Sequence, residues 1–123
     1  MKRRVRLRRK PEFQAALQGR RVFSGKAMVM LAIRGQADVA VTPVRVGVTV
    51  SKQLKSAVER NRARRRLREA ARQSLLTPDS AVLRRGIRYD VVLIARPAAL
   101  TLRFADLKEE TEQAALRLSQ LDS

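Results

Sequence analysis

The sequence predicts a small α+β domain in which helices pack on a short mixed sheet. Three observations support this fold class: 45% of the 123 residues are apolar, two segments have the pattern of strands, and two others repeat apolar residues at helical spacing. A chain of this length forms one domain with a single modest core. We expect residues 1–10 to be a flexible basic arm and residues 11–123 to be the folded domain. The elements follow as helix, two or three strands, helix, strand and helix, an α+β or split βαβ arrangement.

The first element is a short helix that follows the basic arm. Seven of the first ten residues are Lys or Arg. Pro11 suits the first turn of a helix, Phe13, Ala16 and Leu17 have helical spacing, and Gly19 supplies a stop. These signals predict a helix of about two turns.

Extended segments come next and again near residue 90. Residues 22–23 and 26–33 are predicted to be extended, with a turn region over 34–36. Residues 44–50, VRVGVTV, alternate well enough for a strand. Residues 89–95, YDVVLIA, form a nearly continuous apolar run, which is typical of a strand buried on both faces.

A long helix is predicted from Ser56. Ser56 followed by Glu59 has the spacing of a capping box, in which the hydroxyl accepts from a backbone amide of the first turn and the carboxylate returns to the cap. At about 100° per residue, small and apolar side chains fall on one face of this helix. They are Ala63, Leu67, Ala70, Ala71 and Ser74.

The opposite face of this helix is almost uniformly basic. Residues 56–72 hold seven arginines and two glutamates. The residues on the basic face are Asn61, Arg65, Arg68 and Arg72, flanked by Arg62 and Arg64. Like charges at i, i+4 repel one another, so stability alone does not favour this arrangement. Ordinary solvated faces mix charge signs, and we therefore interpret this face as a surface that binds a polyanion.

Charge is unevenly distributed along the chain, whose net charge is +17. Residues 1–105 hold 26 basic and 6 acidic groups, whereas residues 106–123 hold 2 and 5. That last segment belongs to a final amphipathic helix marked by Phe104, Leu107, Thr111, Ala114, Ala115 and Leu118. We expect the partner to meet the first five-sixths of the chain and the last helix to face away from it. The longest apolar run is far too short for a membrane span, and the basic start is not followed by the apolar segment that a signal peptide needs. A cytoplasmic nucleic acid is the simplest partner.

The composition argues against catalysis by the polypeptide itself. The chain has no cysteine, which removes thiolate metal sites, and no histidine, the commonest general base. Carboxylates such as Asp38 and Asp90 are scattered singly, and no phosphate-binding glycine loop is present. We therefore predict no catalytic residue, no metal site and no organic cofactor.

Residues 45–72 resemble the signature of the bacterial ribonuclease P protein subunit, roughly R-x-G-x-x-V-S-K-K-x-G-N-A-V-x-R-N-R-x-K-R-x-x-R-E. The matching positions are Gly47, Val50, Ser51, Lys52, Ala57, Val58, Arg60, Asn61, Arg62, Arg65 and Arg68, with Arg64 in place of a lysine. Residues 6–13 and 90–97 are also similar to family segments. The chain departs from the pattern at Gln53, at Lys55 and Ser56 in place of Gly-Asn, and at Leu17 and Met30 in place of frequent aromatics.

The resemblance implies a division of labour between RNA and protein. In the family, an RNA subunit performs the magnesium-dependent hydrolysis that releases the 5′ leader of precursor tRNA, and the Mg²⁺ is bound mainly by RNA. The implied contacts with that RNA subunit are Lys52, Arg60, Asn61, Arg62, Arg64, Arg65, Arg68 and Arg72. The leader is expected in a cleft between the first helix and the sheet.

The resemblance also implies the lining of that cleft, the topology and the partners. The implied lining is Phe13, Leu17, Met30 and Arg45. The implied topology is α-β-β-β-α-β-α with a central mixed sheet and a left-handed βαβ crossover, an exception to the usual right-handed rule. The implied partners are ribonuclease P RNA and precursor tRNA, with no membrane and no obligate protein partner.

The residues taken alone leave other functions open. A structural RNA-binding protein of ribosomal type would have a basic face without the Arg-Asn-Arg block and the leader cleft. A DNA-binding protein would need a dimer interface or base-reading side chains near the helix start, and Asn61 is the single such residue on the basic face. The role of Phe13 is open as well, because a phenylalanine at such a position is more often part of a core than of a ligand contact.

Overall fold

The computed structural model describes residues 10–34, 44–76 and 89–121. Its elements are α1 (Lys10–Leu17), β1 (Arg20–Ser24), β2 (Met28–Arg34), β3 (Val44–Val50), α2 (Ala57–Ser74), β4 (Tyr89–Ala95), α4 (Ala98–Thr101) and α5 (Phe104–Ser119). The predicted α+β order is confirmed, with the short helix α4 as an addition. The basic arm, apart from Lys10, and the predicted turn at residues 35–36 lie outside the described residues.

The four strands form one mixed sheet in the order β1-β2-β4-β3. β1 and β2 are antiparallel, as are β2 and β4, whereas β3 and β4 are parallel. The chain must therefore cross over between β3 and β4, and α2 lies within that connection. The register places Val91 between Ala32 of β2 and Val46 of β3 at the centre of the sheet.

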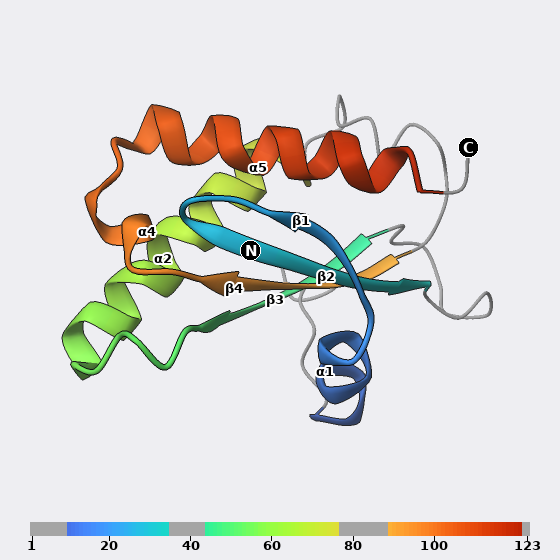
Figure 1. Cartoon of the computed structure of the whole chain (residues 1–123), viewed down its shortest axis with the longest axis horizontal. Helices are drawn as coiled ribbons and strands as arrows, with labels where there is room; N and C mark the ends of the chain where they lie inside the picture. The colour runs from blue at the N-terminus through green and yellow to red at the C-terminus, as the bar shows by residue number, and fades with distance from the viewer. Residues whose placement is uncertain (1–9, 35–43, 77–88, 122–123) are drawn as a thin grey trace.

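The two faces of the sheet carry different layers, as Figure 1 shows, with α5 and α2 on one side and α1 on the other. Alternate strand residues face the α2 and α5 side and form the main core with both helices; they include Met28, Met30, Ala32, Val46, Val48, Val91 and Leu93. The predicted inner face of α2 is confirmed, because Ala63, Leu67, Ala70 and Ala71 are fully buried. On the other face, α1 covers a small cluster around Ala16 and Val92.

Two local features explain how α1 and α4 are placed. At Gly19 an added Cβ would lie 2.5 Å from the carbonyl oxygen of Ala32, so the close return of the chain from α1 into β1 requires glycine. α4 begins directly after Pro97, whose φ of −51° already suits a helix. Four residues are too few to produce a periodic pattern, so the sequence does not predict α4.

A carboxylate on α5 fixes the turn between β1 and β2. The Glu110 side chain accepts hydrogen bonds from the backbone N–H of Lys26 at 3.1 Å and of Ala27 at 2.9 Å. An added Cβ at Gly25 would lie 2.6 Å from the same carboxyl group, so the turn and α5 are in close contact. This link joins residues more than 80 positions apart.

Glu110→Gln should therefore lower the free energy of unfolding by about 1–3 kcal/mol, because one of the two carboxylate acceptors becomes an N–H donor facing backbone amides. Denaturant midpoints measure the loss. The control is Glu109→Gln, an exposed position on the same helix with the same change of charge. Equal midpoints for the two variants would mean that the link to the turn contributes nothing.

Candidate nucleic-acid interface

The N-terminus of α2 has the hydroxyl half of the predicted capping box. The Ser56 hydroxyl accepts from the Glu59 backbone N–H at 3.4 Å, and Ser56 has an extended backbone, so the helix begins without the family's Gly-Asn turn. α2 then packs on β3, β4 and α5 through its small side chains. Its charged side chains are left on the outer surface.

Four of those outer side chains line one open hollow of about 540 Å³: Asn61, Arg64, Arg65 and Arg68. We call these four residues the arginine ribbon. The Nη1 of Arg64 donates to the Asn61 side-chain oxygen at 2.9 Å, which holds the Arg64 side chain along the helix surface. A concave surface with three guanidinium groups suits phosphate, since guanidinium can donate two parallel hydrogen bonds to an oxyanion.

Two other arginines of α2 turn toward the protein. The Nη1 of Arg60 donates to the backbone carbonyl of Leu54 at 2.8 Å and to that of Ser51 at 3.4 Å, so Arg60 ties α2 to the loop that follows β3. Arg66 donates to the carbonyls of Ala99 and Leu102, and so binds α4 to α2. Contact of Arg60 with RNA stays a prediction, and its described partners are within the protein.

The remaining predicted cations lie at the edges of this surface. Lys52 and Arg62 are exposed, Lys52 in the loop that Arg60 holds. Arg72 is exposed too, but it pairs with Glu69 through Nε–Oε2 and Nη2–Oε1 contacts of 2.7 and 2.6 Å. Hydrogen bonds from Arg72 and from Gln73 lower the pKa of Glu69 to about 2. Glu69 is therefore ionised at neutral pH, and the Glu69–Arg72 pair carries no net charge.

The residues predicted to line a leader cleft separate into two groups. Phe13 and Leu17 are half-buried on α1 against Ala16 and Val92, on the sheet face away from α2 and α5. Arg45 lies on the same face, because it alternates along β3 with Val44 and Val46, which belong to the main core on the other face. Its guanidinium makes a bidentate contact with the Asp90 carboxylate, in which Nε donates to Oδ1 at 3.0 Å and Nη2 donates to Oδ2 at 2.9 Å.

The prediction that Met30 lines the leader cleft is wrong. Its side chain is 1% exposed in the main core, on the α2 and α5 side of the sheet. Successive residues of a strand point to opposite faces, so the β2 neighbours Val29 and Leu31 occupy the α1 side instead. Met30 therefore does not line the predicted cleft.

Other kinds of site find little support in the described ranges. Within residues 10–34, 44–76 and 89–121, no three His, Cys, Asp or Glu side chains come together in a way that could hold a metal ion. None of the helices that the structure describes is both long and apolar enough to cross a membrane.

Comparison with known proteins agrees with the resemblance in the sequence. The family model described as Ribonuclease P matches residues 1–119. The ribonuclease P protein component of Symbiobacterium thermophilum is 41% identical over 92% of this chain and 90% of its own length. That of Ruegeria pomeroyi is 42% identical over 91% of this chain and 84% of its own length. Among solved structures, the Staphylococcus aureus RNase P protein superposes with a TM-score of 0.67 at 21% identity, covering 97% of this chain and 98% of that one.

Proposed function

The chain belongs to the ribonuclease P protein family, and on this basis we propose that it is the protein component of a ribonuclease P holoenzyme. In this role it binds the catalytic RNA subunit and the 5′ leader of precursor tRNA, and thereby promotes removal of the leader. The observation that carries the proposal is the arginine ribbon, because three arginines from the family's signature segment line one hollow on the outside of α2.

The ribbon supports binding of the RNA subunit by electrostatics. Neutralising phosphates with Arg releases condensed counterions and provides most of the affinity of a basic protein for nucleic acid. A folded RNA subunit and a precursor tRNA are both polyanions and repel each other. A protein with a net charge of +17 lowers that repulsion, so less magnesium is needed to bring the two RNAs together.

The opposite sheet face supports binding of the leader. Phe13 offers an apolar ring next to Leu17, and the Arg45–Asp90 pair offers polar groups on the same face. The side chains of this pair are partly exposed, at 21% for Arg45 and 15% for Asp90. Single-stranded RNA is bound in this way elsewhere, through aromatic stacking beside a basic groove.

Magnesium is assigned in this proposal to the RNA subunit and the substrate. Bound Mg²⁺ would supply Lewis-acid assistance and a nucleophilic water for hydrolysis of the phosphodiester. The protein's residues contribute cations and an apolar surface. A cytoplasmic location and the lack of an obligate protein partner are further parts of the proposal.

Reconstitution tests this function. The RNA-free protein should not cleave precursor tRNA, whereas adding it to ribonuclease P RNA at low Mg²⁺ should raise the cleavage rate, because its cations offset the repulsion between the two RNAs. The measurement is the rate of leader release under single-turnover conditions, with and without protein.

The same assay separates the alternatives. Site-specific cleavage by the RNA-free protein would contradict the proposal, as would an RNA-alone rate that the protein leaves unchanged. Equal binding of ribosomal RNA fragments and ribonuclease P RNA, together with an unchanged rate, would favour a structural protein of ribosomal type.

A further inference from the structure

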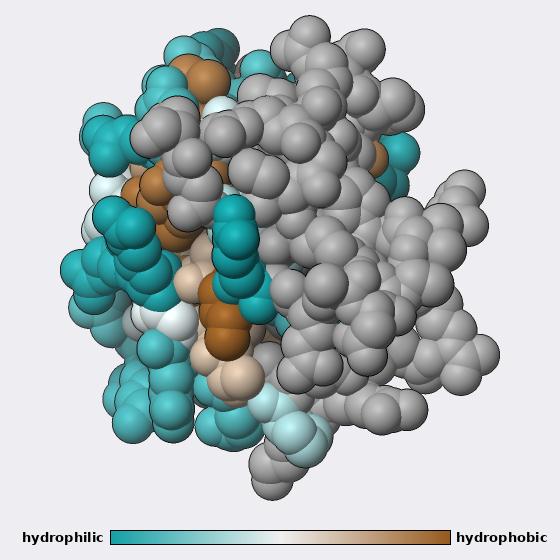
Figure 2. Space-filling view, turned by 90° about the vertical axis from the view of Figure 1, so that its right-hand side faces the viewer, coloured by the Kyte–Doolittle hydropathy of each residue, from teal (hydrophilic) through white to brown (hydrophobic). Residues whose placement is uncertain are grey.

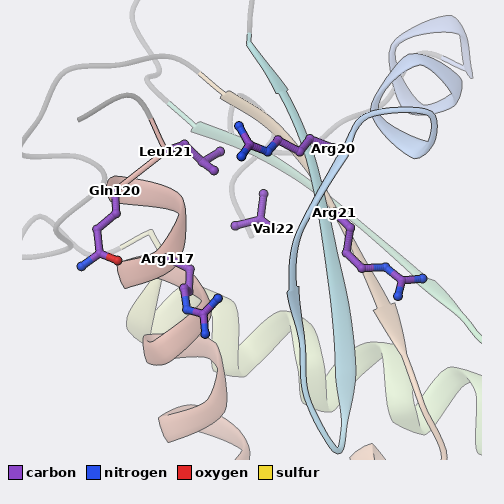
Figure 3. Close-up of a pocket in the computed structure, with 6 residues that line it drawn as sticks. All are labelled: Arg20, Arg21, Val22, Arg117, Gln120 and Leu121. Carbon is purple, nitrogen blue, oxygen red and sulfur yellow. The ribbon is translucent and has the colours of Figure 1, made fainter.

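A second basic hollow lies between β1 and the C-terminal end of α5. Its volume is about 320 Å³, and it is lined by Arg20, Arg21, Val22, Arg117, Gln120 and Leu121. Figure 3 shows Arg20 and Arg117 on its two sides, Val22 between them, and the Arg21 guanidinium directed away from Arg117. The hollow thus has two cations, Arg20 and Arg117, on the two sides of a small apolar floor, and Arg21 lines it with its guanidinium pointing away.

A β-bulge and the edge position of β1 place these arginines. The pairing of β1 with β2 shifts register between Arg21 and Phe23, so Val22 is the extra residue, and it is buried in the main core. Arg20 pairs with Ala32, a residue of the α5 side, and therefore faces the helix. β1 is the edge of the sheet, so no further strand in the described sheet covers it.

The three guanidinium groups have no partner among the residues that the structure describes. Within those residues, no hydrogen bond or ion pair is present at the side chains of Arg20, Arg21 or Arg117. Among the described residues, carboxylates contact the guanidinium groups of other arginines, for example those of Arg45, Arg72 and Arg103. Placing the cations Arg20 and Arg117 on two sides of one hollow, with Arg21 next to them in the chain, costs Coulomb energy that no described carboxylate offsets. An external anion would offset that cost.

The charge at the end of α5 differs locally from the acidic excess of its segment. The excess of acidic residues after position 105 predicts that the last helix faces away from the partner. Arg117 belongs to that helix, but folding brings it beside Arg20 of β1. The C-terminal end of α5 therefore carries a local positive surface. Figure 2, turned toward the right-hand side of Figure 1, shows hydrophilic side chains around a few apolar ones over the described part of that face.

We propose that the hollow of Arg20, Arg21 and Arg117 binds phosphate groups of RNA, as a second anchor separate from the arginine ribbon. The inference rests on the proposed function in that the RNA is either ribonuclease P RNA or precursor tRNA. β1 and β3 are opposite edges of the sheet, and α2 contacts β3 whereas α5 contacts β1. Figure 1 shows the start of α2 and the end of α5 at opposite ends of the molecule.

Two separated phosphate sites allow the protein to hold RNA at two points at once. A second contact made within the same complex benefits from a high effective concentration, and so raises affinity well beyond a single site. If the second point is on the RNA subunit, the hollow secures the holoenzyme. If it is on the precursor tRNA, the protein bridges the two RNAs.

The test compares Arg20→Gln/Arg117→Gln with Arg103→Gln. Arg103 caps the start of the same helix 14 positions before Arg117, about 21 Å away along the axis, and pairs with Asp106 at 3.3 Å. Affinities of the full-length protein for ribonuclease P RNA, precursor tRNA and an unrelated structured RNA are measured across a salt series. The double variant should lower the slope of log K against log[salt] by about 2 on the RNA that uses the hollow, because each phosphate bound by an arginine adds about one unit to the slope.

A variant that restores charge separates binding from folding. Arg20→Lys/Arg117→Lys should recover most of the slope, and circular dichroism should show unchanged melting for all variants. Wild-type slopes for the glutamine double variant on all three RNAs would overturn the inference, and so would a loss in Arg103→Gln that is as large per arginine removed, that is, about 1.

A different pair of results would show that the proposed function is wrong while the hollow still binds RNA. The wild-type protein would then not raise cleavage by ribonuclease P RNA, whereas removing the arginines of the hollow would still lower the salt slope on the unrelated RNA. A lower slope on one specific RNA together with intact cleavage stimulation at high protein concentration supports both proposals. A wild-type protein that binds none of the three RNAs overturns both.

Discussion

The joint substitution of Arg64, Arg65 and Arg68 by glutamine is expected to weaken binding of ribonuclease P RNA on the order of 100-fold at about 0.15 M salt. Each phosphate bound by an arginine contributes about 0.9 to the slope of log K against log[salt], so the triple variant should have a slope lower by about 2.7. The three side chains line one hollow on the outer side of α2, and none of them is among the buried residues of the helix, although the Nε of Arg68 is itself buried. We expect the fold to survive the change. The measurement is RNA affinity at several salt concentrations, with thermal melting as a check on folding.

Single variants sharpen this prediction. Arg65→Gln should lower the slope by about 1, because Arg65 is exposed within the ribbon. Arg103→Gln removes the same charge from a side chain that is 85% exposed and already paired with Asp106, and it should change the slope little. Equal losses for the two single variants would show that net charge, rather than a defined surface, determines binding.

Arg60 and Arg66 should behave differently from the ribbon. Both donate to backbone carbonyls of neighbouring segments, so their removal leaves carbonyls without a partner and loosens the loop after β3 or the helix α4. Their substitution should therefore lower the melting temperature, which distinguishes a positioning residue from one that only contacts RNA. The helical spacing alone does not separate these two from Arg65.

How far the sequence predicts the structure depends on the range of the interaction. Local rules are sufficient for the Ser56 cap, the inner face of α2 and the buried strand over residues 89–95, because propensity, capping and burial all act within a few residues. Local rules do not predict the direction of the long Arg60 side chain, because that direction depends on the position of backbone carbonyls in a neighbouring loop.

Strand parity and long-range packing account for the other differences. Met30 is buried in the main core, whereas the predicted cleft is on the other face of the sheet. Neighbouring residues of a strand point to opposite faces, so an error of one position assigns a side chain to the wrong face. The Glu110 link to the β1–β2 turn and the meeting of Arg20 with Arg117 in one hollow both join distant segments. No spacing rule along the chain brings such residues together.

Phe13→Ala is expected to weaken binding of leader-bearing precursor tRNA by about 5- to 150-fold while leaving mature tRNA unaffected. This range corresponds to about 1–3 kcal/mol for one base stacked on an aromatic ring. Phe13 is half-buried beside Ala16 and Val92, in the small cluster under α1 and apart from the main core. The ring is thus held in place yet accessible. Affinities for precursor tRNA with and without its leader, measured on the reconstituted holoenzyme, give the leader-specific part directly.

The matched control is Leu17→Ala, which truncates a half-buried side chain of the same cluster and helix but removes no ring. If stacking is the source of leader affinity, Phe13→Ala must reduce leader-specific binding more than Leu17→Ala does, whereas both should lower the denaturant midpoint only modestly. Removal of a fully buried Phe costs about 3–5 kcal/mol of folding stability. A loss of that size for Phe13→Ala, with no difference between precursor and mature tRNA, would make Phe13 a core residue and remove it from the leader site.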